Sequence, residues 1–235
     1  MEVCIEDENH GTVESLHVND VVKIILILDH SKKPFKQSDI LKFMSDKPDR
    51  KAWPDIFKYA KDKLNEMGLT LNKTNSNSFF VSNSHSPLNF MHQYAMESEV
   101  ADRTLLMLIL ALIFMMERPV TDAELFSHFQ QLQIYSTEKP VHPYFGDVKK
   151  KLMTEFVSQL YLEKIIDKDT ETIHFNWGQR AHAEVSKKSV LEFVCEIGYQ
   201  GKIQPKNLVT HYAKAMEEEE LHKSQEATEC CEVLD

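Results

Sequence analysis

The feature that most constrains the fold is a helix that leads into a β-hairpin in the C-terminal half of the chain. Apolar residues spaced by fours predict an amphipathic helix over residues 147–160. Two short strands are predicted next, over 161–166 and 172–177, because a polar, turn-forming segment separates them. Gly178 then ends the second strand, and helical composition follows. This pattern predicts a mostly α-helical (α+β) domain that carries a short hairpin.

The same order of elements is predicted earlier in the chain. The first three helices are expected over residues 19–30, 36–44 and 54–67. Pro54 suits the first turn of the third helix, and Gly68 suits its end. Residues 69–71 and 79–81 then predict a hairpin around a polar turn. The chain therefore contains a structural repeat of three helices and a hairpin, without obvious sequence identity between its halves.

The second copy begins with an apolar helix over residues 104–116. Thr121 and Glu124 have the spacing of a capping box for the next helix. Two more helices are expected after the second hairpin, at about 180–197 and 205–220. These elements predict the following organisation: a disordered acidic N-terminus (1–15), a first helical domain (16–84), a linker (85–100), a second domain with C-terminal helices (101–216) and an acidic tail (217–235).

Charge is concentrated at the two ends of the chain. The formal net charge is −10, but residues 1–15 hold five acids and no Lys or Arg, and residues 217–235 hold eight acids and one lysine. The part between them is close to neutral, with a modestly basic first half. Net charge therefore neither excludes nucleic acid as a partner nor argues strongly for it.

Several function classes find no support in the sequence. The longest apolar run, residues 105–116, is well short of the ~20 residues that span a bilayer, so no membrane association is expected. Four cysteines without a CxxC pair predict neither a zinc site nor a disulfide framework. We find no nucleophile elbow, phosphate loop or HExxH motif, so the chain is predicted to be non-enzymatic and to need no cofactor.

Two stretches resemble one known family. Residues 175–193 resemble the C-terminal signature of the MAGE homology domain, and residues 104–115 with 121–126 resemble its apolar helix and the helix after it. The resemblance extends over roughly residues 16–220. It implies tandem winged-helix domains with hairpin wings and extra C-terminal helices; the periodicity supports the element order, and the term "winged" rests on the resemblance.

The resemblance also implies partners. In the MAGE family a paired leucine is tied to binding of a RING-type ubiquitin ligase, and the matching residues here are Leu105 and Leu106. Composition alone favours both as core residues, because apolar helical runs are usually buried. The helix is apolar on all sides, however, so we expect a second stripe to meet another surface.

Lysines indicate a second binding candidate, duplex DNA. Lys149, Lys150 and Lys151 begin the third helix of the second copy, and Lys187 and Lys188 follow its hairpin. The competing interpretation is that they solvate exposed helix faces. No arginine is positioned to read guanine, so any contact is expected to be with phosphates and largely independent of sequence.

Three interpretations of function stay open. The first is an interaction subunit that binds a RING ligase and a kleisin-type partner, resembling the MAGE-type non-SMC subunit of a chromosome-maintenance complex in DNA repair. The second is a ligase adaptor outside that complex, and the third is a stand-alone DNA-binding regulator. The resemblance implies a nuclear location, with the cytoplasm as an alternative.

Overall fold

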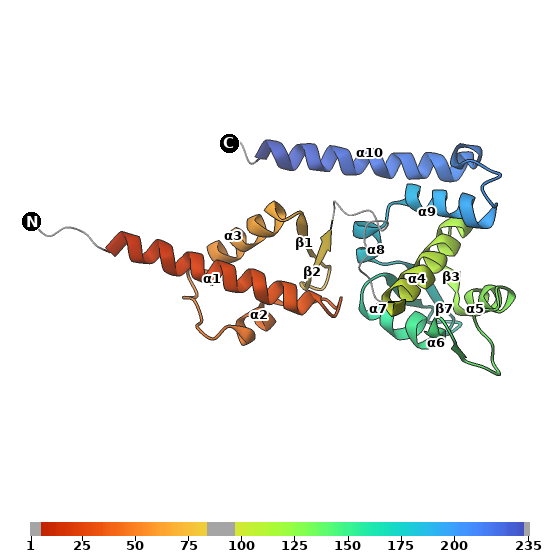
Figure 1. The fold of residues 1–235 in the computed structure, drawn as a ribbon, viewed down its shortest axis with the longest axis horizontal. Helices are drawn as coiled ribbons and strands as arrows, with labels where there is room; N and C mark the ends of the chain where they lie inside the picture. Colours follow the sequence, from red (N-terminus) through yellow and green to blue (C-terminus); the bar gives the residue numbers. More distant parts are fainter. Residues whose placement is uncertain (1–5, 84–96, 233–235) are drawn as a thin grey trace, which may run out of the picture. The chain divides into compact units, whose positions relative to one another are not determined.

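The structure is a computed structural model that describes residues 6–83 and 97–232, with side-chain environments for 17–83 and 98–220. It is mostly helical, with small antiparallel sheets (Figure 1). The chain divides into two compact units: unit 1 comprises residues 1–87 with 158–160, and unit 2 comprises residues 88–157 with 161–235. The predicted linker, 85–100, lies mostly outside the described residues.

Unit 1 has the predicted order of three helices and a hairpin. Its elements are α1 (Glu6–Asp29), α2 (Gln37–Phe43), α3 (Trp53–Glu66), β1 (Leu69–Lys73) and β2 (Phe79–Asn83). The strands pair antiparallel with Leu71 opposite Val81. Thr74 closes the turn, since its hydroxyl accepts a hydrogen bond from the Ser78 amide at 3.0 Å. The predicted hairpin is confirmed, and each strand runs two residues beyond its predicted end.

The core of unit 1 follows the helical spacing. The buried apolar residues from its three helices include Val18, Val21, Val22, Ile25, Ile40, Ile56, Ala60 and Leu64. Met67 continues the spacing of Ala60 and Leu64 but is 55% exposed, because it lies just beyond the end of α3. At the end of α1, the buried Asp29 accepts a hydrogen bond from the Val81 amide at 3.2 Å. This contact ties the first helix to the hairpin.

Unit 2 repeats the order with additions. Its first elements are α4 (Glu97–Met116), β3 (Val120–Thr121), α5 (Asp122–Gln131), β4 (Val141–His142), β5 (Gly146–Asp147), α6 (Val148–Lys150), η2 (Lys151–Glu155), α7 (Phe156–Ser158), β6 (Leu162–Ile166) and β7 (Ile173–Trp177). The main sheet has the order β3-β7-β6. The predicted hairpin, β6–β7, and the capping box of Thr121 with Glu124 are confirmed.

Three features of unit 2 were not predicted. The two-residue strand β3 pairs with β7, and β4 pairs with β5 in a second small antiparallel pair between α5 and α6. The third helix contains a π-helical turn, η2, between its α-helical ends. A strand of two residues is too short to show alternating hydrophobicity. A π-helical turn has the same kinds of residues as an α-helix, so neither feature can be recognised in the sequence.

The C-terminal helices correct two predictions. Their elements are α8 (Gln179–Glu184), α9 (Lys187–Phe193), η3 (Val194–Gly198), η4 (Pro205–Asn207) and α10 (Val209–Glu232). The single helix predicted over 180–197 is interrupted, because Val185 is extended and Ser186 starts a new helix by accepting a hydrogen bond from the Ser189 amide. Residues 6–15, predicted to be disordered, belong to α1, and the predicted acidic tail continues α10 as far as residue 232, beyond the helix end predicted at 220.

The end of the hairpin is fixed to α8 by a buried polar group. Arg180 is fully buried, and its guanidinium donates a hydrogen bond to the Glu184 carboxylate at 3.0 Å. The Tyr161 hydroxyl donates to the other oxygen of Glu184 at 2.6 Å. The arrangement joins the start of β6 to α8, so the signature stretch around Arg180 is part of the packing of unit 2.

Helix α4 is the centre of unit 2. No residue from 101 to 116 is exposed, and the buried members of the helix are Ala101, Leu105, Leu106, Ile109, Leu110, Ala111, Ile113 and Phe114. Strand β7 and helix α9 both pack against α4. Within the described residues, no helix has the length and apolar content that crossing a membrane requires.

Candidate functional site

The candidate site lies where α4 ends. Glu117 has a left-handed backbone conformation (φ 55°), and Pro119 prevents the helix from continuing. Val120 then enters β3 and pairs with Phe175 of β7. This connection places the end of α4 beside the end of β7, where Trp177 leads into α8.

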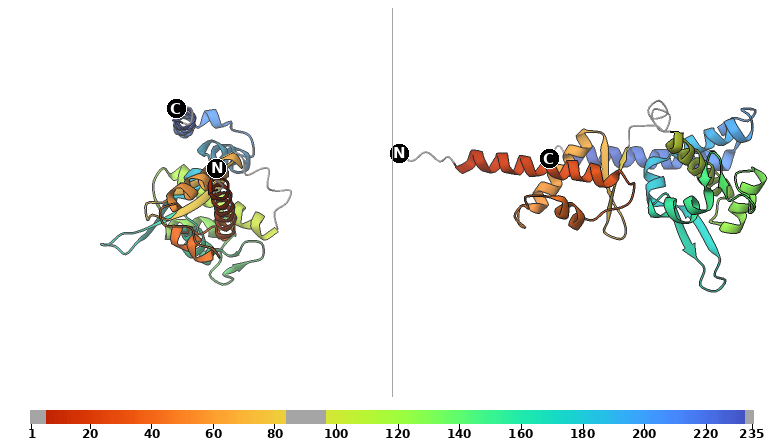
Figure 2. Two further views of the ribbon diagram at one scale, coloured as in Figure 1. Left: turned by 90° about the vertical axis from the view of Figure 1, so that its left-hand side faces the viewer. Right: turned by 60° about the horizontal axis from the view of Figure 1, so that its bottom comes forward.

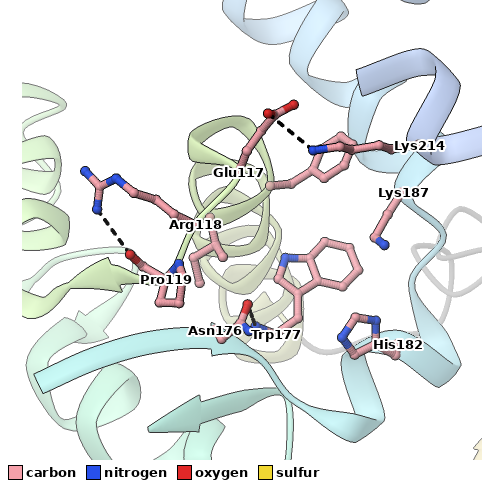
Figure 3. A pocket seen from close by; sticks show the side chains of 10 residues that line it. Glu117, Arg118, Pro119, Asn176, Trp177, His182, Lys187 and Lys214 are labelled. Atoms are coloured by element: carbon pink, nitrogen blue, oxygen red, sulfur yellow. Dashed lines mark hydrogen bonds and ion pairs between the residues drawn. The ribbon is translucent and has the colours of Figure 1, made fainter. Parts of the chain in front are cut away.

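A pocket of about 250 Å³ opens at this junction (Figure 3). Its walls come from α4, the α4–β3 turn, β7, α8, α9 and α10. The lining residues are Ile113, Phe114, Glu117, Arg118, Pro119, Asn176, Trp177, His182, Lys187 and Lys214. The pocket therefore exists because the C-terminal helices fold back against the hairpin.

Aromatic side chains form the apolar part of the pocket. The Trp177 indole N–H donates a hydrogen bond to the Leu110 carbonyl of α4 at 3.0 Å, which fixes the ring. Phe114 contacts Trp177 with ring centroids 6.4 Å apart and meets His211 of α10 edge-on at 5.4 Å. His182 lies 5.4 Å from the Trp177 ring. A rigid aromatic surface of this kind suits an apolar side chain of a protein partner.

Charged groups at the pocket are paired on the side of α4. Glu117 lies 3.2 Å from Lys214 and 3.4 Å from His211, both of α10. Arg118 pairs with Glu124 at 2.6 Å. The Arg118 hydrogen bond, with those from Thr121, lowers the pKa of Glu124 to about 2. The pocket is thus bordered by neutralised pairs.

A second set of ion pairs joins α8 and α9 to α10. Glu218 lies 3.2 Å from Lys187 and 3.7 Å from His182, and Glu219 lies 3.6 Å from Lys188. Burial raises the pKa of Glu218, but hydrogen bonds from His182 and Lys187 and the Lys187 charge outweigh burial and leave it below its ordinary value. Glu218 is therefore favoured in its ionised form beside Lys187 and His182.

Comparison with known proteins decides the family. The model of the MAGE homology domain matches residues 69–188. The chain belongs to the MAGE family. It is 34% identical over 211 residues to the human protein named non-structural maintenance of chromosomes element 3 homolog, covering 87% of this chain and 67% of that protein.

Three further proteins are similar to this MAGE chain. The mouse protein of the same name is 33% identical, with 87% of this chain and 73% of that protein covered. A chain in a solved structure titled "Nse1-Nse3-Nse4 complex" superposes with a TM-score of 0.75 at 34% identity, covering 87% of this chain and 98% of that chain. Human melanoma-associated antigen B2 is 30% identical, covering 85% of this chain and 62% of that protein.

The predicted partner residues of the MAGE domain lie in its core. Leu105 is fully buried and Leu106 is 8% exposed, both packed within unit 2. Elements of unit 2 cover most of α4, and the expectation that a second stripe of this helix meets another surface stays a prediction. Its half-buried apolar residues are Met107, Leu108, Leu112, Met115 and Met116.

The predicted DNA-binding lysines form ion pairs with carboxylates. Lys150 lies 3.0 Å from Glu155, Lys151 pairs with Asp102, and Lys187 and Lys188 pair with α10 as described above. Lys149 is exposed, with no partner found among the described side chains. Lysine spacing shows which side chains share a helix, but it cannot show the acidic partners that another element supplies.

Sequence reasoning missed most of the pocket. Trp177 belonged to the signature stretch, but the roles of Glu117 and Lys214 had no signal, since they depend on where α10 packs. The acidic run 217–220 was interpreted as the start of a tail, whereas Glu218 and Glu219 hold lysines. Within the described parts of the chain, no group of three or more His, Cys, Asp or Glu side chains is arranged to hold a metal ion.

Proposed function

We propose that this MAGE protein is a non-catalytic interaction subunit that binds and regulates a RING-type ubiquitin ligase within a chromosome-maintenance complex of the DNA-repair type, in the nucleus. The carrying observation is the match at 34% identity and a TM-score of 0.75 to a chain of the Nse1-Nse3-Nse4 complex. A likeness this extensive supports the same kind of assembly, with a RING ligase and a kleisin-type subunit as partners.

The fold supports a binding role. Each unit has three helices and a hairpin, which we interpret as tandem winged-helix domains with the proposed boundaries 16–84 and 101–216. Unit 2 adds an aromatic pocket with polar edges, and binding sites for proteins commonly combine an apolar anchor site with a polar rim.

In this proposal, Leu105 and Leu106 contribute to ligase binding indirectly, by stabilising the fold of unit 2. Because both side chains are buried, they support the surface that the ligase meets, and they do not form it. Changing both to alanine is expected to remove copurification of the RING partner. The matched control is Ile109→Ala with Leu110→Ala, which removes two equally buried side chains one turn later in α4.

The experiment measures partner capture and thermal unfolding for both double variants. Selective loss of the RING partner by the L105A/L106A variant, at a stability equal to the control, supports the assignment. Equal loss in both variants assigns the effect to the stability of unit 2. Normal capture by a folded L105A/L106A variant contradicts the role of the pair.

The alternative is a ligase adaptor that acts outside the chromosome complex. Affinity purification with mass spectrometry separates the two. Recovery of a kleisin-type subunit and SMC-type subunits supports the first proposal, whereas a RING ligase recovered with substrates alone supports the adaptor.

A second activity, weak duplex DNA binding, is favoured by Lys149. This lysine is exposed at the start of the third helix of unit 2, the helix that enters the major groove in related helix-turn-helix proteins. Contacts would be to phosphates, so affinity should fall with salt. Fluorescence anisotropy with a short duplex across a salt series tests this, and no binding at low salt would contradict it.

A further inference from the structure

The ion pairs between α10 and the two helices before it carry a further inference. Lys187 and Lys188 stand at the start of α9, and α10 runs along α9 in the same unit (Figures 1 and 2). Two consecutive carboxylates of α10 each form an ion pair with one of these lysines: Glu218 with Lys187, and Glu219 with Lys188. The acidic helix thus occupies the same cations that a phosphate backbone would use.

The Lys187–Glu218 pair is more buried than an ordinary surface pair. The Lys187 side chain is 27% exposed and that of Glu218 is 17% exposed. Glu218 also faces His182, and one of its oxygens, Oε2, is buried without a hydrogen-bond partner among the described residues. This carboxylate lies between Lys187 and His182 although its hydrogen bonding is incomplete, so a competing anion has less to displace than it would at a fully hydrogen-bonded pair.

We propose that α10 is an intramolecular competitor of DNA, in which Glu218 and Glu219 mimic two phosphates and withhold Lys187 and Lys188 from the duplex. The proposal rests on the proposed DNA binding and adds its regulation. A duplex, or a partner that draws α10 away, releases both lysines together, because one helix carries both carboxylates.

The groups around the contact are mixed in charge. On α8 and α9 the basic side chains are His182, Lys187 and Lys188, and on α10 the carboxylates of residues 217–220 pair with them or flank the pairs. Removing two carboxylates therefore changes both the specific pairs and the general repulsion of DNA. The test has to separate these two effects.

The test compares two doubly substituted proteins, each with two fewer negative charges. Glu218→Gln with Glu219→Gln removes the pairs, while Glu196→Gln with Glu217→Gln removes exposed carboxylates of η3 and α10 that have no partner among the described residues. Full-length protein is titrated against a fluorescent duplex at several salt concentrations.

The competitor proposal predicts a steeper salt dependence for the first variant. Log affinity falls as log salt concentration rises, and each phosphate contact adds about 0.9 to the steepness of this fall. Two freed lysines should therefore make the slope steeper by between about one and two. Affinity at low salt should rise by about 3- to 10-fold, and the control should show a smaller rise with an unchanged slope. Adding Lys187→Gln and Lys188→Gln to the first variant should cancel its gain.

Each outcome has a separate meaning. Equal behaviour of the two variants, or a gain that survives loss of both lysines, overturns the competitor proposal and leaves DNA binding standing. No binding by any variant at low salt overturns the DNA proposal itself. If the double variant does not fold, as judged by circular dichroism, Glu219→Gln alone is used, and its slope should increase by about 0.9.

Discussion

Units 1 and 2 share one order of elements, but they differ in how they cover their first helix. In α1, Ile27 is 67% exposed and Leu26 is 37% exposed. In α4, no residue from 101 to 116 is exposed. Both helices contain a strongly apolar run, residues 21–28 in α1 and 105–116 in α4, so the difference between these runs does not come from composition. Unit 2 adds β3 and the helices α8 to α10, and part of this addition packs against α4.

The comparison shows that elements added to a repeated order of helices and strands can change how deeply the first helix is buried. A three-helix unit with a two-stranded hairpin leaves one side of its first helix uncovered. When further helices fold back, as in unit 2, that side becomes core, and a pocket forms where the added helices meet the hairpin. The candidate site is then formed by the added elements and the end of α4 together.

The largest expected difference between the units comes from large-to-small substitutions in the first helices. Leu105→Ala should lower the free energy of unfolding of unit 2 by about 2–5 kcal/mol, because it leaves a cavity in a packed core. Ile27→Ala should change the stability of unit 1 by less than about 0.5 kcal/mol. Each unit holds one tryptophan, Trp53 or Trp177, so denaturant unfolding of W53F and W177F backgrounds reports each unit. Equal losses of stability from the two substitutions would contradict the conclusion that α4 is more enclosed than α1.

A smaller effect is expected at the contact that ties α1 to its hairpin. Asp29→Ala should destabilise unit 1 by about 1–3 kcal/mol, since the buried Val81 amide loses its hydrogen bond. Asp62→Ala, on the exposed face of α3, is the control and should have little effect. Unfolding followed through Trp53 measures both. If the two substitutions cost the same, the buried contact does not hold unit 1 together.

The cap of α5 tests a local feature of unit 2. Thr121→Ala should cost about 1 kcal/mol, because the Glu124 amide loses its acceptor at the start of the helix. Thr121→Ser keeps the hydroxyl and should remain close to the original stability. Chemical denaturation in the W53F background measures the difference. An alanine variant as stable as the serine variant would show that the cap is dispensable.

The smallest effect concerns pH at the edge of the pocket. The pKa of Glu124 is lowered to about 2, mainly by Arg118. Since the folded-state pKa lies below the ordinary carboxyl value, this group contributes stability above about pH 4.5, and the contribution is lost as pH falls toward 2. Carboxyl NMR titration should place the Glu124 midpoint near 2, and Glu124→Gln should remove that part of the acid dependence. A midpoint near 4.5 would contradict the pairing.

Much of the fold was predictable because its signals are local. The spacing of apolar residues located the three helices and the hairpin of each unit, and Thr121 with Glu124 marked a helix start. The break at Val185 and Ser186 was missed, since both residues also occur within helices. The helical ends of α1 and α10 were missed because charge runs are compatible with disorder and with exposed helix alike.

The candidate site was predictable only in part. Lysines were identified as a group, but their carboxylate partners come from elsewhere: Asp102 from α4 for Lys151, and Glu218 from α10 for Lys187. Composition favoured Leu105 and Leu106 as core residues, and both are buried, but their predicted role in partner binding stays a prediction. The covering of their helix by later elements could not be foreseen. Contacts across 30 or more residues leave no periodic trace in a single sequence.

By itself, the sequence determined the mostly helical class, the repeated order of elements, the family resemblance and the apolar character of α4, because each of these follows from residues close together in the chain. The tertiary structure alone decided that α4 is enclosed, that a pocket forms at its end, and that α10 neutralises Lys187 and Lys188. These features depend on which distant surfaces meet, and burial and ion pairing are properties of that meeting.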